Sequence, residues 1–279
     1  MSIEPAAESA SVLPPSESTE HRLQLPRDTA VESVIAMVRN VRPEASFNGG
    51  VLDLGEGSTL VADQGKRGRG RWTLHTVRDR EDPSPEGLDD SHGYGRAFPE
   101  GLPFGEERRA LDLAWSLGRR LFGAVVTDSG ARLEPHPCHV RDLAVVSPYA
   151  LAPESFAQLL APLEPDAMLD EAPSELARIG YSAQIDADAD GFIDITVGKA
   201  APRTALAALS WADTACEYVI THHPLDEAED GIEIPDPQVA ESWTRIYRRI
   251  GMIAGLLVEN LGGYVIDVEG FLVDPADLI

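Results

Sequence analysis

Two long segments of this 279-residue sequence recur further along the chain without gaps. Residues 28–45 align with residues 150–167 at an offset of 122, and residues 110–135 align with residues 250–275 at an offset of 140. The second match keeps six residues identical and in register, namely Leu117, Leu121, Gly123, Val125, Gly130 and Pro135. Self-similarity at a fixed spacing is typical of a repeated structural unit. The two matches therefore predict a tandem duplication of one domain.

The change of offset means that the second copy holds 18 additional residues. Residues 202–217, with a proline near the start and an Ala/Leu run behind it, are predicted to be a helical insert. Ahead of both copies, residues 1–20 carry four Glu and no Lys or Arg, which favours a disordered acidic tail over a targeting peptide. We therefore predict a tail over 1–20, a first repeat over 21–141 and a second repeat over 142–279.

Each copy is predicted to be an α+β domain with the order β-α-β-β-β-α-β-β, in which helices cover one face of a sheet rich in antiparallel strands. The predicted strands of the first copy before its second helix are 22–25, 51–54, 59–62 and 72–77. Those of the second copy are 143–146, 182–185, 192–197 and 218–221. The loop over 79–103 is rich in Pro, Gly and acidic residues and is expected to be a mobile surface flap.

The second helix of the second copy has the clearest periodicity in the chain. Its apolar residues recur every three or four positions, which indicates one buried face. These residues are Val239, Trp243, Ile246, Ile250, Ile253, Leu257 and Leu261. Gly123 and Gly263 follow the two second helices and are predicted to end them in the left-handed conformation.

Part of the second copy resembles a known family. The segment holding Trp211 and Ala215, the strand EYVITHH and the amphipathic helix that ends at Gly-Gly resemble an uncharacterised bacterial domain-of-unknown-function family over 182–275. That family implies no known activity. The order of helix, three strands, helix and hairpin is also similar in outline to type III secretion chaperones and their non-secretory relatives, which implies a topology only.

Negative charge is concentrated in the second copy. Residues 142–279 hold 25 acidic and 6 basic residues, whereas residues 21–141 hold 18 and 17, within a net charge of -24. Such a chain repels nucleic acid and anionic membranes, so neither is expected as a partner. The basic run 66–71 is expected to be a solvated loop. A basic protein is the predicted partner, and it would bind six carboxylates whose neutralisation should leave the fold nearly unchanged: Asp226, Glu227, Glu229, Asp230, Glu233 and Asp236.

An acidic segment, residues 186–194, reproduces the start of an EF-hand calcium loop. Asp186, Asp188, Asp190 and Asp194 occupy positions 1, 3, 5 and 9, and a glycine stands at position 6. Position 12, however, is Val197 instead of the bidentate Glu, and the flanks read as strands. A β-hairpin with acidic residues in solvent is the first interpretation, and a weak calcium site is the alternative.

The remaining metal-ligating candidates are histidines. His136 and His139 lie between the copies, and His222 and His223 end a predicted strand, but no second pair follows at zinc-finger spacing. The alternative to a metal site is an interdomain connector for the first pair and structural packing for the second. The two cysteines, Cys138 and Cys216, are too few to crosslink a chain of this size, so a reducing cytoplasm is expected.

No nucleophile elbow, Walker loop or dinucleotide-binding glycine motif is present. The sequence therefore favours a non-enzymatic protein-interaction or adaptor module, chaperone-like in outline, whose two copies pack as an intramolecular pseudo-dimer without a cofactor. The alternative is a metal-dependent or hydrolytic enzyme that acts through histidines at the seam between the copies. An enzyme requires a concave pocket with converging polar groups, whereas an adaptor requires an exposed patch.

Overall fold

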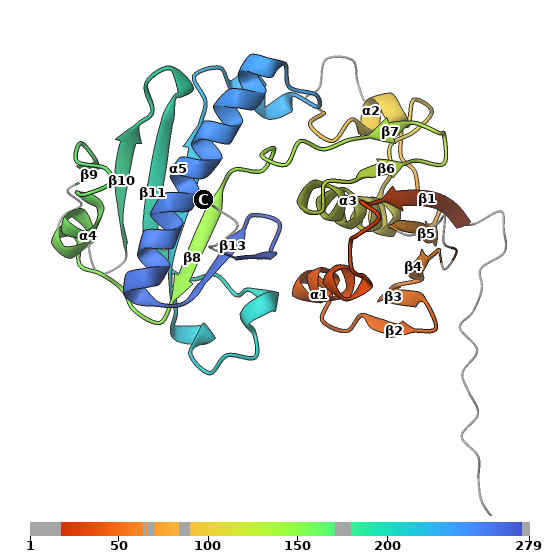
Figure 1. Cartoon of the computed structure of the whole chain (residues 1–279), viewed down its shortest axis with the longest axis horizontal. Coiled ribbons are helices and arrows are strands. Elements are labelled where there is room, and N and C mark those ends of the chain that lie inside the picture. The colour runs from red at the N-terminus through yellow and green to blue at the C-terminus, as the bar shows by residue number, and fades with distance from the viewer. Residues whose placement is uncertain (1–17, 64, 66–69, 84–89, 171–179, 275–279) are drawn as a thin grey trace, which may run out of the picture.

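The computed structural model describes residues 18–63, 65, 70–83, 90–170 and 180–274. Within them the chain forms two seven-stranded sheets in which every neighbouring pair of strands is antiparallel (Figure 1). Residues 18–141 form the first half of the molecule, and residues 142–274 form the second half. Residues 66–69 of the basic run lie outside the described residues, as do residues 1–17 of the predicted tail.

The first sheet has the strand order β2-β3-β4-β5-β1-β6-β7. Its strands are β1 (Ser18–Gln24), β2 (Ser46–Asn48), β3 (Val51–Gly55), β4 (Ser58–Ala62), β5 (Arg71–Val77), β6 (Ala124–Val126) and β7 (Arg132–Leu133). Its helices are α1 (Val31–Val41), α2 (Tyr94–Ala97) and α3 (Gly105–Arg120). The first strand begins at Ser18 and so includes three residues of the predicted tail.

The second sheet has the strand order β14-β13-β8-β12-β11-β10-β9. Its strands are β8 (Leu143–Ser147), β9 (Met168–Leu169), β10 (Gly180–Asp186), β11 (Phe192–Lys199), β12 (Cys216–His223), β13 (Tyr264–Asp267) and β14 (Leu272–Val273). Its helices are α4 (Pro153–Leu160) and α5 (Pro237–Leu261). If the strands of each half are numbered from its own first strand, both sheets have the order 2-3-4-5-1-6-7, with the second sheet read from β9 to β14.

The registers of the two sheets also correspond. In the first sheet Leu23 pairs with Val125 across β1 and β6. In the second sheet Val145 pairs with Val265 across β8 and β13. Val145 lies 122 residues after Leu23, and Val265 lies 140 residues after Val125. These are the two offsets of the ungapped sequence matches. The pairing of β6 with β7 shifts by 140 onto that of β13 with β14 in the same way.

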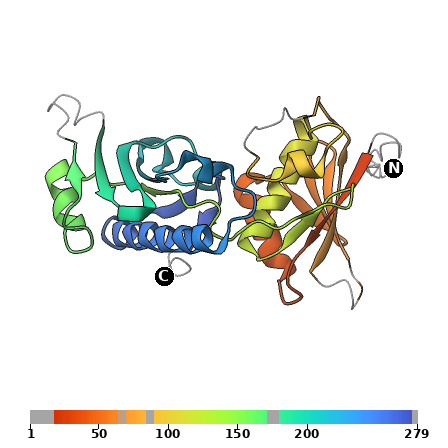
Figure 2. The same cartoon turned by 90° about the horizontal axis from the view of Figure 1, so that it is seen from above.

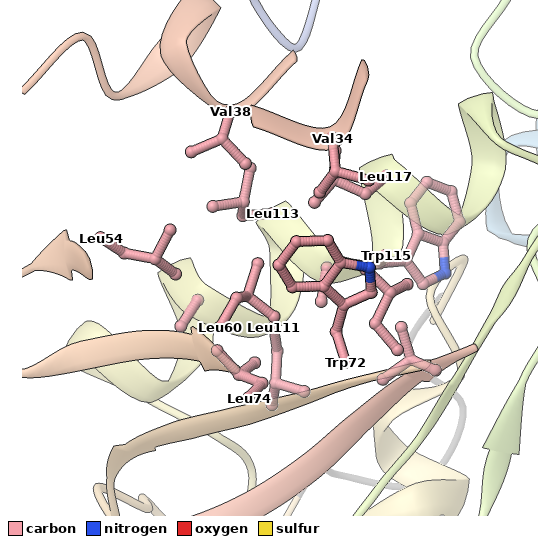
Figure 3. Packing of buried hydrophobic residues seen from close by; sticks show 14 of the residues in the cluster. Val34, Val38, Leu54, Leu60, Trp72, Leu74, Leu111, Leu113, Trp115 and Leu117 are labelled. Atoms are coloured by element: carbon pink, nitrogen blue, oxygen red, sulfur yellow. The ribbon is translucent and has the colours of Figure 1, made fainter. Parts of the chain in front are cut away.

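Alternating burial explains the first sheet. In β1 and β5 every second side chain faces the helices, while the others face solvent. Leucines at 54, 60 and 74 contact the apolar faces of α1 and α3 (Figure 3). The strands therefore present one apolar face, and the helices cover it.

In the second half, helices also cover one apolar face of the sheet, and a further segment covers part of the opposite face. The apolar stripe of α5 packs on one face of its sheet together with α4. Asp236 caps α5 by accepting hydrogen bonds from the backbone N–H groups of Gln238 and Val239, at 2.8 and 3.0 Å. On the opposite face, Val146 and Ile266 are covered by Leu206 and Ala215 from the segment between β11 and β12.

The long α3 lies between the first sheet and the second half (Figure 2). Leu111 and Leu117 contact the first sheet, while Ser116 and Arg119 contact the second half. Most of the helix is therefore buried, even though its sequence is rich in charge.

The two glycines predicted to end α3 and α5 act through close approach to a strand. A Cβ atom on Gly123 would lie 2.4 Å from the carbonyl oxygen of Gln24, and one on Gly263 would lie 2.1 Å from that of Val146. The left-handed residue that ends α3 is Phe122, with φ of 54°, and not Gly123. The predicted mechanism was therefore wrong for Gly123, although both helices end where predicted.

Three local predictions were wrong. Each half has one more strand than predicted, since the short edge strands β2 and β9 carry too few residues to show alternation. Residues 202–217 contain two short 3-10 turns instead of a helix, and their apolar residues cover the sheet. The described part of the loop over 79–103 is packed and not a flap, because Tyr94 and Phe98 are each only 1% exposed.

The close approach of Gly263 to β8 yields a stability test. Gly263→Ala forces a Cβ atom against a backbone carbonyl at positive φ, so we expect a loss of about 2–4 kcal/mol of unfolding free energy. Gly255→Ala is the matched control, because no atom lies within 4 Å of its added Cβ in the middle of α5. The control should gain about 0.5–1 kcal/mol from helix propensity. Urea titration followed by circular dichroism measures both, and equal stabilities of the two variants would contradict the packing described.

Candidate functional site

The two halves are joined by a buried cluster of four charged residues, referred to below as the charge cluster: Arg119, Arg120, Asp267 and Glu269. Arg119 at the end of α3 donates to Asp267 at 3.0 Å and to Glu269 at 2.7 Å, in the turn between β13 and β14. Arg120 pairs with the same two carboxylates. Arg119 and Asp267 are each 3% exposed, so this pair is shielded from water, while Arg120 and Glu269 are partly buried.

Burial sets the electrostatics of the charge cluster. Burial, together with the neighbouring Arg119 guanidinium, lowers the pKa of Arg120 to about 9. Burial alone would raise the pKa of Glu269, but Arg119 and Arg120 outweigh it and lower that pKa. Removing one member of a buried pair costs about 3–5 kcal/mol, because the remaining charge is left uncompensated. The cluster therefore ties the position of the second half to α3.

An apolar contact accompanies the charge cluster. Phe271, in the same turn of the second half, is buried in the apolar core of the first half, and the Arg120 guanidinium lies over its ring at 4.2 Å. The backbone N–H of Leu272 donates to the Asn40 side chain of α1 at 3.1 Å. The hairpin of β13 and β14 thus contacts both α1 and α3 of the first half.

A cavity of about 740 Å³ lies between the halves, and we call it the seam cavity. The first half contributes residues of α3, of the loop before α2 and of the connector around residue 140, and the second half contributes the end of β12 and the turn between β13 and β14. The lining residues that carry chemistry are His92, Trp115, His139, Arg141, Asp142 and His222. This volume lies within the usual range of small-molecule sites, which is about 300–1,000 Å³.

Aromatic and histidine rings form one wall of the cavity. The rings of His92 and Trp115 lie 4.3 Å apart, and those of Trp115 and His139 lie 5.1 Å apart in a T-shaped arrangement. His139 also contacts Trp243 of α5 at 5.2 Å. The Arg141 guanidinium lies over the Trp243 ring at 4.7 Å. These contacts fix the wall from both halves, so the cavity has a defined shape.

His222 is held on both ring nitrogens. Arg141 Nε donates to His222 Nδ1 at 3.0 Å, and His222 Nε2 donates to the carbonyl oxygen of Asp190 at 2.6 Å. The backbone N–H of His222 donates to Asp142 Oδ1 at 2.9 Å. Because both nitrogens are engaged, His222 acts here as a positioning group for Arg141 and Asp142.

Burial favours the neutral form of three of the cavity histidines, namely His92, His139 and His222. Burial lowers the pKa of His92 and His222, and it lowers the pKa of His139 to about 4. Burial raises the pKa of Asp142, although the His222 N–H and Arg141 both favour its carboxylate form. At neutral pH the charges on the cavity wall are therefore carboxylates and guanidinium groups.

The structure brings together three of the four candidate histidines. His139, His222 and His223 line the seam cavity, while His136 packs against Trp243 at 5.7 Å and does not line it. Among the residues that the structure describes, no group of three or more His, Cys, Asp or Glu side chains is arranged to hold a metal ion. Sequence reasoning missed His92 and Trp115, which give no periodic or motif signal.

The acidic segment over 186–194 forms the turn between β10 and β11. Asp190 forms two hydrogen bonds with Arg245, at 3.0 and 2.8 Å, and accepts another from Ser242. These hydrogen bonds lower the pKa of Asp190, in spite of its partial burial. Asp186 accepts a hydrogen bond from the backbone N–H of Asp188 at 2.8 Å, and Asp194 lies within β11. A calcium ion would therefore compete with Arg245 for Asp190.

Five of the six carboxylates predicted to bind a partner have intramolecular partners. Asp230 pairs with Arg141 at 3.1 Å, and Glu233 pairs with Arg96 of the first half. The three that accept hydrogen bonds from N–H groups are Asp226, Glu229 and Asp236. These side chains therefore contact the rest of the molecule, and neutralising Asp230 and Glu233 would remove their ion pairs with Arg141 and Arg96.

The neutral histidines make stability depend on pH. The folded state keeps His139 unprotonated down to about pH 4, whereas the unfolded state takes up this proton near the ordinary value of 6.5. Stability should therefore fall as the pH drops below 6.5. His139→Gln removes this titrating group, so it should reduce the loss of stability between pH 7 and pH 5 by about 2 kcal/mol. Urea titrations at the two pH values measure this, and an unchanged pH slope for His139→Gln would contradict it.

No protein-family model, curated protein or solved structure matches this chain. Within the described ranges, no helix is long and apolar enough to cross a membrane. The two antiparallel sheets with their helices make the fold a mixed α and β architecture. What the molecule does must therefore be argued from the geometry of the seam cavity.

Proposed function

We propose that this protein is a non-enzymatic binding module made by tandem duplication of one α+β domain, with the seam cavity as its ligand site. One observation carries the proposal. The cavity has the volume of a small-molecule site and is lined by polar and aromatic side chains from both halves. A ligand there would contact both domains at once, so binding would stabilise their arrangement.

Support for the duplication comes from strand order and register. Each half has the same order of strands. The residue pairs between β1 and β6 correspond to those between β8 and β13 when 122 is added to the residue numbers in β1 and 140 to those in β6. Gly123 and Gly263 approach the equivalent strand in the two halves at equivalent positions. A chance match in sequence would not be expected to preserve hydrogen-bond register, because a slip of one residue reverses every side chain.

The partners of the polar groups favour binding over catalysis. His222 has both ring nitrogens engaged, so it lacks a free nitrogen to act as a base. Ser116 donates to Glu269, whose pKa is lowered by two arginines and which is therefore a weak proton acceptor. Ser91 lies 3.2 Å from His92 Nδ1, but no described carboxylate forms a hydrogen bond that orients this ring.

An enzyme remains the second candidate, on one observation. His92 and His139 line the same cavity and are neutral at pH 7, as a general base must be. The test of the binding proposal must therefore include a check for turnover of any ligand found.

A thermal-shift screen of small molecules tests the proposal. A ligand at 100 times its Kd stabilises the folded state by about 2.7 kcal/mol, which corresponds to a shift of about 5 °C for a protein of this size. We expect hits that raise the Tm of the wild type and leave Thr221→Trp unaffected, since Thr221 lines the cavity and the new indole would fill it. Thr196→Trp is the matched control on the neighbouring strand, where residue 196 is exposed.

The outcomes of the screen separate the candidates. Hits that act on the wild type and Thr196→Trp but not on Thr221→Trp support binding in the seam cavity. Hits that are chemically converted by the protein favour the enzyme. A screen in which every hit acts equally on all three proteins would contradict a ligand site in this cavity.

A further inference from the structure

We propose that the ligand of the seam cavity is a small, flat organic cation, of the amidinium, guanidinium or protonated aromatic amine class, held by the Asp142 carboxylate. This inference rests on the proposed function, because it names the ligand class of the same site. It follows from three features of the cavity. These are the one lining carboxylate without a salt bridge, the net negative charge around it, and the aromatic and apolar side chains beside it.

Six of the seven lining carboxylates and guanidinium groups are in salt bridges. In the first half these are Arg42, Arg109, Asp112 and Arg141, and in the second half they are Asp230 and Glu269. The exception is Asp142, for which the described part of the chain provides no salt bridge. A charge that lines a cavity without a salt bridge is the natural partner for a ligand of opposite sign.

The net sign around Asp142 is negative. Arg141 is the positive group closest to it in sequence, and Arg141 is surrounded by the carboxylates of Asp142, Asp230 and Glu229. Three carboxylates therefore face one guanidinium. The neighbouring histidines add no positive charge at pH 7, because burial holds their pKa values below the ordinary one. The chain as a whole, at -24, draws cations towards it.

Asp142 also has hydrogen-bonding capacity to spare. Its Oδ1 accepts the backbone N–H of His222 at 2.9 Å, and no described residue donates to its Oδ2. A carboxylate accepts from a planar amidinium or guanidinium through two parallel N–H groups, which is the strongest pairing that it forms with a cation. An anion or a neutral molecule would gain no such interaction.

The remaining lining favours a flat body on that cation. The rings of His92 and Trp115 both line the cavity and lie 4.3 Å apart. Leu113, Val140 and Phe271 supply apolar surface on both sides of the seam. Planar rings stack on such surfaces, and aromatic faces attract cations.

Isothermal titration calorimetry with three probes of almost identical shape tests the proposal. The probes are benzamidine, benzamide and benzoate, which differ mainly in carrying a positive, zero or negative charge. The proteins are the full-length wild type, Asp142→Asn, and Glu241→Gln, which neutralises an exposed carboxylate of α5 outside the cavity. Asp142→Asn keeps the oxygen that accepts from His222, and circular dichroism checks that it folds.

We expect the wild type and Glu241→Gln to bind benzamidine at least tenfold more tightly than benzamide or benzoate, and Asp142→Asn to lose at least tenfold of that affinity. Equal binding of benzamide or benzoate, or an unchanged affinity in Asp142→Asn, would overturn the cation assignment and leave the cavity as a site for another class. If Asp142→Asn fails to fold, the comparison of the three probes on the wild type decides. If no probe binds and the thermal-shift screen finds no cavity-specific hit, the proposed function itself fails.

Discussion

The charge cluster between α3 and the β13–β14 turn is the interaction on which the arrangement of this molecule depends. It places two guanidinium groups and two carboxylates at the contact between the halves, with Arg119 and Asp267 buried and Arg120 and Glu269 partly buried. Loss of one partner while the halves stay packed would leave a buried charge uncompensated, which is costly. The adjacent Phe271 adds apolar contact, because it completes the core of the first half from the second.

The seam cavity is a consequence of this contact. The charge cluster and Phe271 fix the second half against one end of α3, and the connector around His139 passes beside them to reach β8. Asp112 and Trp115, which lie nearer the start of α3, line the seam cavity together with the end of β12. Polar side chains are stable in that cavity only where they are paired, which explains why six of its seven acidic and arginine groups form salt bridges and why Asp142 stands out.

The sequence predicted regular elements well wherever a periodic signal existed. The stripe from Val239 to Leu261 predicted α5 over its described length, and the central strands of both halves were placed within a few residues. Edge strands β2 and β9 were missed because two or three residues cannot show alternation. The segment over 202–217 was predicted to be helical from its alanines, but its role in covering Val146 and Ile266 prevailed over intrinsic propensity.

The candidate site was less predictable, for a physical reason. His139 and His222 were noticed as residue types, but their placement depends on contacts between residues about 80 positions apart. His92 and Trp115 come from a loop and a helix of the first half, and only the packing of the halves brings them to the second. The net charge of the second copy likewise could not show that five of its acidic loop residues contact arginine or N–H groups of the same chain. Local sequence patterns predict helices and strands, whereas a cavity between two halves depends on contacts between residues that are distant in the sequence.

Calorimetric unfolding of the wild type and Asp267→Asn tests the central claim, which is that the charge cluster makes the two halves one cooperative unit. Asn at 267 keeps the acceptor for the turn's backbone N–H groups and removes only the charge facing Arg119 and Arg120. The control is Asp213→Asn, which neutralises an exposed carboxylate in the segment between β11 and β12. We expect the wild type and this control to unfold in one transition with equal calorimetric and van't Hoff enthalpies, and Asp267→Asn to unfold in two separate transitions. Two transitions in the wild type, at temperatures that Asp267→Asn leaves unchanged, would contradict the claim.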